Sequence, residues 1–192
     1  MTVNTRLRSL QQKPVKPADS LVNRLIFESP LGWIGLAIRH GQLVRLVFGH
    51  RSQQAAQRRL PAGSLAPTDH EAAFLEALRE RLLAFTSGSS DDFLDIPVDT
   101  SHATAFQRRV LQSCRRIPVG QTRSYGQLAR LAGSPNAARA VGTVMANNHV
   151  PLIIPCHRVV AAGGKLGGFS APSGVQLKRR LHHLEQTMIA RP

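Results

Sequence analysis

A thiol, an imidazole and a guanidinium stand next to one another at Cys156, His157 and Arg158, between two apolar runs. A free thiol has a pKa of about 8.5 and is mostly protonated at neutral pH, so a nucleophilic cysteine needs a base or a positive charge nearby. Both are present, and we expect this setting to favour the thiolate. If the segment is extended, neighbouring side chains point to opposite faces, and His157 reaches Cys156 only through a turn or a bridging water.

An imidazole that acts as a base is usually held in one tautomer by a carboxylate. Between residues 100 and 192 the only acidic residue is Glu185, which borders the apolar stripe of a helix predicted to start near Gly174. We expect Glu185 to be semi-buried and paired with the histidine. Two alternatives stay open: a buried structural thiol, and a surface salt bridge of Glu185 to one of three arginines, which are Arg179, Arg180 and Arg191.

Composition narrows the class of protein. Only two cysteines occur, Cys114 and Cys156, without a CxxC pair or a histidine spacing that completes a zinc site. We therefore expect neither a metal nor a cofactor, and we place Cys114 in a helix core. The two isolated cysteines also favour an intracellular protein. No apolar stretch approaches the roughly 20 residues that span a bilayer, which argues against a membrane protein.

Positive charge is concentrated in the second half of the chain. Residues 1–99 carry 12 Lys or Arg and 10 Asp or Glu, whereas residues 100–192 carry 13 Lys or Arg and one acidic residue. Basic side chains that replace counterions on phosphates supply most non-specific affinity for nucleic acids. The charge thus favours a nucleic-acid partner for the second half, with an anionic membrane surface or general basicity as alternatives.

Turn-rich residues 87–92 suggest a boundary near residue 100. Residues 1–20 read as a basic, disordered tail. Residues 21–98 read as an α/β domain, because apolar or alternating runs at 25–28, 33–39 and 43–48 suit a small meander. A helix follows, opened by a capping box between Thr68 and Glu71.

Residues 99–192 read as a mostly helical domain. Capping pairs open one helix at Thr104 and another at Ser124. The chain then turns at Gly133, and a further helix is predicted over residues 136–146. This outline is a helix-turn-helix. Small residues on the second helix permit close approach to a surface, and Arg139 projects among them; a tight helix–helix contact is the alternative. The small residues are Ala137, Ala138, Ala140 and Gly142.

Several separated motifs together resemble the C-terminal domain of the O6-alkylguanine-DNA alkyltransferases, over about Phe106 to Glu185. Residues 155–159 (PCHRV) resemble the active-site motif of that family, and the other matching segments keep the order and spacing of the family. The first half is only loosely similar, through residues 29–32, and the resemblance suggests a small ribonuclease H-like sheet plus a helix there. The other segments are 117–120, 124–125, 138–142, 168–170 and 174–185.

The resemblance implies that Cys156 accepts the alkyl group, with His157 acting through water and Glu185 orienting His157. It implies that Asn148 joins the second helix to the active-site segment. The backbone carbonyls of Cys156 and Val159 would face the guanine amino group.

The resemblance also implies that Tyr125 lies by the flipped nucleotide, that Arg139 fills the vacated stack and that the loop at Ser170 approaches O6. The implied partner is double-stranded DNA containing O6-alkylguanine, contacted in the minor groove and without sequence preference. The implied reaction is a single-turnover transfer of the alkyl group from O6-alkylguanine to Cys156, and O4-alkylthymine is expected as a second substrate. The protein is expected to act as a monomer. The location is the cytoplasm with the nucleoid in a bacterium, or the nucleus in a eukaryote.

Two departures from the family pattern are His149, where many members have proline, and a longer loop over residues 168–174. Two other functions compete with alkyl transfer. A lesion-binding protein of the same fold would lack the acceptor thiol, which Cys156 supplies. A cysteine hydrolase would use Cys156, His157 and Glu185, but would leave the basic half and the helix pair unexplained.

Overall fold

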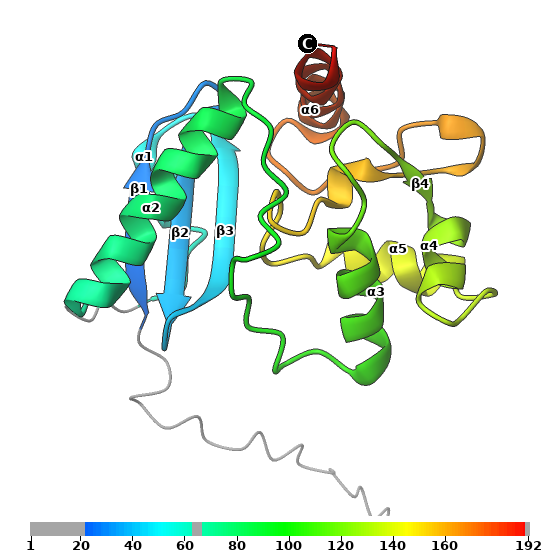
Figure 1. The fold of residues 1–192 in the computed structure, drawn as a ribbon, viewed down its shortest axis with the longest axis horizontal. Helices are drawn as coiled ribbons and strands as arrows, with labels where there is room; N and C mark the ends of the chain where they lie inside the picture. Colours follow the sequence, from blue (N-terminus) through cyan, green and yellow to red (C-terminus); the bar gives the residue numbers. More distant parts are fainter. Residues whose placement is uncertain (1–21, 63–66, 191–192) are drawn as a thin grey trace, which may run out of the picture.

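The computed structural model describes residues 22–62 and 67–190, so the predicted basic tail over 1–20 lies outside the described residues. Its first part is a three-stranded antiparallel sheet in the order β1-β2-β3, shown in blue and cyan in Figure 1. The strands are β1 (Asn23–Phe27), β2 (Trp33–Arg39) and β3 (Gln42–His50). The predicted meander is confirmed, because the apolar runs form consecutive strands joined by tight turns.

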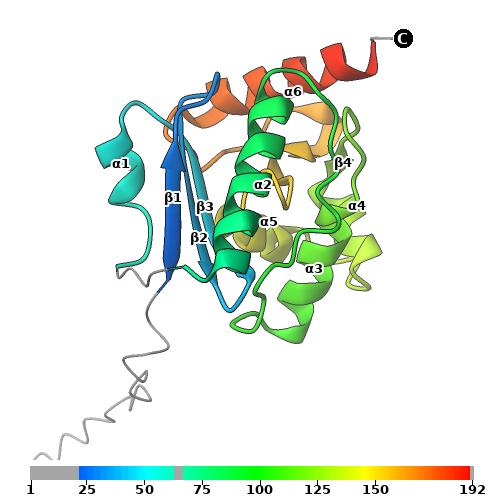
Figure 2. The same ribbon diagram turned by 60° about the vertical axis from the view of Figure 1, so that its left-hand side comes forward.

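Helices cover both faces of this sheet (Figure 2). The long helix α2 (Asp69–Thr86) buries Leu78 and Leu82 against one face, and its predicted Thr68–Glu71 capping box is confirmed. The short helix α1 (Gln53–Gln57) places Ala56 against the other face. The sequence analysis missed α1, since five residues are too few to show a helical period.

Three helices open the second half, as predicted: α3 (Ala105–Arg115), α4 (Tyr125–Leu131) and α5 (Ala138–Ala146). Capping boxes start α3 at Thr104 and α4 at Ser124. Gly133, with φ of 71°, ends α4 in the left-handed region that glycine tolerates, and the chain turns into α5. Cys114 is completely buried within α3, which confirms it as a core residue.

A two-stranded parallel pairing follows that the sequence did not reveal. Strand β4 (Arg123–Ser124) pairs with β5 (Val159–Val160), directly after the short 3-10 turn η2 (Cys156–Arg158). The pairing fixes the start of α4 beside the thiol segment. A further 3-10 turn, η3 (Ala162–Gly164), leads through a loop to the last helix, α6 (Gly174–Ile189).

The two halves share one buried apolar cluster. Phe48 on β3 meets Phe169 of the second half edge to face, with ring centroids 6.2 Å apart. The Leu46 amide donates to the His149 carbonyl at 2.9 Å. The fold is thus an α/β first half followed by a mostly helical second half with a helix-turn-helix, and a domain boundary at residues 98/99 stays a prediction.

Candidate active site

Cys156 begins the 3-10 turn η2, so the segment is not extended and the turn that the sequence left open is present. The Cys156 amide donates to the Ile154 carbonyl at 2.8 Å, and the Arg158 amide donates to the Pro155 carbonyl at 2.9 Å. These bonds close a tight turn in which Cys156, His157 and Arg158 are all buried. The thiol is therefore held by backbone geometry at the point where the chain enters β5.

Helix α6 carries the Glu185 carboxylate to this turn. His157 Nε2 lies 2.8 Å from Glu185 Oε1, and both side chains are buried. Arg158 donates to the same carboxylate from Nε at 2.9 Å and from Nη2 at 2.8 Å, and the Gly120 amide donates at 3.0 Å. Among the described residues the surface salt bridge is not seen, because the arginine partner of Glu185 is Arg158 and Arg180 donates to the Pro30 carbonyl. Arg191 lies outside the described residues.

Charge fixes the tautomer of His157. Burial alone would raise the pKa of Glu185, but hydrogen bonds from His157 and Arg158, together with the positive charge of Arg158, lower it to about 2. The carboxylate is therefore ionised and accepts a hydrogen bond from the Nε2–H group of His157, which leaves Nδ1 as an acceptor. Burial lowers the pKa of His157, so the ring is neutral. Its Nδ1 atom is buried and has no hydrogen-bond partner among the described residues.

Burial dominates the titration of the Cys156 thiol. The pKa of Cys156 is raised by burial, and the Asn148 amide and the Lys178 ammonium offset only part of that rise. The expectation that the sequence neighbourhood favours a thiolate is therefore wrong for the protein alone, because the guanidinium of Arg158 is directed at Glu185. The thiol needs a proton acceptor when it reacts.

Lys178 is a site residue that the sequence analysis missed. Its side chain is buried on α6, and Nζ donates to the Val159 carbonyl at 2.6 Å. Burial lowers the pKa of Lys178, while the thiols of Cys156 and Cys114 raise it. The only sequence signal was a lysine one residue after Leu177 on the apolar stripe of the helix.

Asn148 links the end of α5 to the thiol segment. Its Nδ2 donates to the Ile154 carbonyl at 2.7 Å, and its Oδ1 accepts from the Val150 amide at 3.1 Å. The adjacent His149 accepts from Arg45 on β3 and packs against His102 at a centroid distance of 5.1 Å. Histidine at this position therefore connects the thiol segment to the first half of the chain.

Tyr125 starts α4 and lies against the loop that leads to α6. A Cβ atom built at Gly167 would come within 3.1 Å of the Tyr125 hydroxyl, so only glycine fits there without displacement. Burial raises the pKa of Tyr125, as does the nearby Cys156. The phenol is thus protonated and able to donate a hydrogen bond close to the thiol.

The outer face of α5 carries the predicted DNA-contacting residues. Arg139 and Ala140 are exposed, whereas Ala137, Ala138 and Gly142 are half-buried. The Cβ of an alanine at Gly142 would reach Tyr125 at 4.0 Å, so this side of α5 packs on α4. The small residues of α5 therefore lie partly in its contact with α4 and partly on its exposed outer surface.

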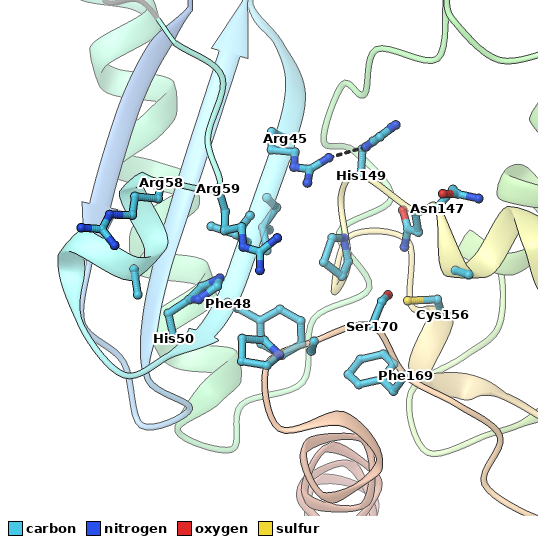
Figure 3. Close-up of a pocket in the computed structure, with 18 residues that line it drawn as sticks. Arg45, Phe48, His50, Arg58, Arg59, Asn147, His149, Cys156, Phe169 and Ser170 are labelled. Carbon is cyan, nitrogen blue, oxygen red and sulfur yellow. Dashed lines mark hydrogen bonds between the residues drawn. The ribbon is translucent and has the colours of Figure 1, made fainter.

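A cavity of about 590 Å³ opens beside the thiol, between the two halves of the chain (Figure 3). Cys156, Asn148 and Ser170 line it, whereas His157 and Glu185 lie behind the thiol. Val159 is buried, with its carbonyl already accepting from Lys178. The structure thus gathers Cys156, His157, Glu185, Asn148 and Val159 around one turn. Ser170 lines the same cavity as Cys156, and Tyr125 and Arg139 lie on α4 and α5.

Among the described residues, no group of three or more histidine, cysteine or acidic side chains is placed to hold a metal ion. Within residues 22–62 and 67–190, no helix is long and apolar enough to cross a membrane.

Residues 105–187 match the family model of the 6-O-methylguanine DNA methyltransferase, DNA binding domain. The matched region contains the thiol turn, the helix pair and Glu185. The fold and the site thus define a DNA-binding protein with a buried cysteine at its centre.

Relatives match over most of the chain. A methylated-DNA–protein-cysteine methyltransferase of Mycolicibacterium paratuberculosis is 36% identical over 83% of this chain and 89% of its own. One from Methanosarcina acetivorans is 37% identical over 83% and 96%. A crystal structure of Mycobacterium tuberculosis OGT in complex with DNA superposes with a TM-score of 0.69 at 34% identity, covering 87% of this chain and 94% of that one. The chain belongs to the family of methylated-DNA–protein-cysteine methyltransferases.

Proposed function

We propose that this protein repairs DNA by direct reversal, and that Cys156 takes the alkyl group from O6-alkylguanine in double-stranded DNA. One observation carries the assignment: the buried Cys156 directly precedes the buried His157 in one turn, and the His157 ring has Nε2 held by Glu185 and Nδ1 unpartnered among the described residues. The family membership supplies the substrate class.

The thiol proton passes through a bridging water to His157 Nδ1, since an acceptor is needed at a thiol whose pKa is raised. The sulfur then attacks the alkyl carbon, a C–S bond forms and the C–O6 bond breaks. The bond electrons go to guanine O6. Tyr125 donates a hydrogen bond to the guanine ring as the negative charge develops. The product thioether has no carbonyl that water could attack, so each molecule acts once.

Aiming this displacement requires the nucleotide to leave the base stack. We assign Arg139 to fill the vacated position, because it is exposed on the outer face of α5. Ala137, Ala138, Ala140 and Gly142 allow the helix close to the minor groove. Asn148 holds the thiol segment to α5. Ser170, which lines the cavity, approaches O6, and the carbonyls of Cys156 and Val159 face the guanine amino group.

We extend the proposal in three further respects: the protein also acts on O4-alkylthymine, works as a monomer, and is found with the nucleoid in a bacterium or in the nucleus of a eukaryote. The unit over residues 21–98 is a separate domain of ribonuclease H-like type, supported by its three-stranded antiparallel sheet and the helix α2.

Mass spectrometry tests the acceptor assignment. After incubation with an oligonucleotide that carries one O6-methylguanine, we expect one methyl group per protein molecule, at Cys156. Cys156→Ala is expected to bind the same DNA without accepting the methyl group, and Cys114→Ala serves as the matched control that still accepts it. Methylation elsewhere, or none in folded protein, would exclude Cys156 as the acceptor. Repeated turnover without a thioether would instead favour a cysteine hydrolase.

A further inference from the structure

The cavity beside Cys156 has a second wall that the alkyl-transfer reaction does not use. This wall belongs to the first half of the chain, on β3 and at the end of α1 (Figure 3). Four basic side chains lie on it, and we call them the basic wall: Arg45, His50, Arg58 and Arg59. The charge count by sequence gave the first half almost no net charge, so this local cluster was hidden.

The charge of the basic wall is uncompensated. None of the described residues that line the cavity is an aspartate or a glutamate. Arg58 and Arg59 are exposed and form no ion pair with the described acidic residues. Burial and the charge of Arg59 lower the pKa values of both Arg45 and His50. Mutual repulsion within the wall would be relieved by a bound anion.

The basic wall is continuous with the proposed DNA-binding surface. The exposed residues of α5 include Arg139 and Thr143 and end at Ala146 and Asn147. Ala146 and Asn147 also line the cavity that the basic wall faces. A strand of DNA that follows the outer face of α5 toward its end is therefore led to the cavity between the two halves.

We propose that the basic wall of the first half binds backbone phosphates of the DNA whose damaged base enters the Cys156 site. This surface extends the DNA contact beyond the helix-turn-helix onto the first half of the chain. The proposal rests on the proposed function for the choice of DNA as the polyanion. Because phosphates carry no sequence information, the contact adds affinity and fixes orientation without adding sequence preference.

The test measures how the affinity for undamaged duplex DNA depends on salt, using the full chain. Each lost phosphate contact lowers the magnitude of the slope of log K against log salt by about 0.9. For the double variant Arg58→Gln/Arg59→Gln we therefore expect a slope smaller by about 1.8, with weaker binding at low salt. The matched control is Arg116→Gln/Arg179→Gln, which removes the same charge from two exposed arginines outside the cavity lining.

A slope and affinity equal to wild type in the Arg58/Arg59 variant, or a loss no larger than in the control, would overturn the proposal. A second measurement separates it from the proposed function. The Arg58/Arg59 variant should react with free O6-benzylguanine at the wild-type rate, because the free base has no phosphates, and a slower reaction would show that the variant disturbs the thiol site itself. Failure of the wild-type protein to react with the free base would count against alkyl transfer, while the slopes would still report on the basic wall.

Discussion

The Glu185 carboxylate accepts hydrogen bonds from His157 and Arg158 at 2.8 Å each, with all three side chains buried. One carboxylate thus sets the tautomer of the proposed base and neutralises a guanidinium that has no access to water. The contact spans 28 positions of sequence for His157, so helix α6 must be docked for the site to exist. Catalysis and stability are therefore coupled at Glu185.

We expect Glu185→Gln to lose transfer and to unfold at a lower temperature. The substitution leaves Arg158 buried without a charge partner, a change that costs about 3–5 kcal/mol. Calorimetry and the rate of transfer from free O6-benzylguanine measure the two effects. Glu80→Gln, at an exposed position on α2, is the control and should change neither. A Glu185→Gln protein with wild-type stability and rate would contradict this account of the buried cluster.

The same cluster predicts acid destabilisation. The pKa of Glu185 is lowered to about 2 in the folded protein, from an ordinary value of 4.5. Its contribution is fully present above pH 4.5 and is lost as the pH falls through the folded value. The lowered pKa of His157 acts in the same direction below about pH 6.5. Denaturant unfolding between pH 7 and pH 3 should show falling stability, with a shallower fall in Glu185→Gln.

Much of this site was visible in the sequence. Glu185 stood out as the only acidic residue of the second half, and side-chain capping pairs located the starts of α2, α3 and α4. Local signals of this kind act over three or four residues and survive without tertiary information.

What the sequence concealed depends on distant contacts. Arg158 was expected to activate Cys156, but its guanidinium group donates to Glu185, which lies 27 residues further along the sequence. Lys178 reaches the Val159 carbonyl across 19 positions. The strands β4 and β5 have two residues each, too few to show alternation, yet they set Tyr125 beside the thiol turn.

Lys178 is expected to help form the thiolate as a positioning residue. In Lys178→Met the side chain keeps roughly its volume but loses the ammonium group near Cys156. The pKa of the Cys156 thiol should therefore rise further. Each unit of that rise slows transfer about tenfold at neutral pH. The pH profile of reaction with free O6-benzylguanine should move to higher pH, while Arg179→Met, exposed on the same helix, should leave it in place. A uniform slowing without a shifted profile would indicate a purely structural role.

Gly167 offers a test of the place of Tyr125. In Gly167→Ala the new Cβ would lie 3.1 Å from the Tyr125 hydroxyl, so the phenol or the loop must move by a few tenths of an ångström. Small displacements of reacting groups are costly, and we expect transfer to slow about tenfold. Gly168→Ala is the matched control, because its Cβ would meet nothing within 4 Å. Equal rates in the two variants would remove Tyr125 from the proposed mechanism.

Arg139 should matter only when the base has to leave a duplex. The side chain is exposed, so Arg139→Ala should keep the stability of the fold. Losing the group that fills the vacated stack raises the cost of extrusion, and about 1.4 kcal/mol corresponds to a tenfold slower reaction on duplex DNA. Reaction with free O6-benzylguanine should stay at the wild-type rate, as should both reactions of Arg116→Ala. An equal loss on duplex and free base would place the effect of Arg139 at the thiol and not in the DNA stack.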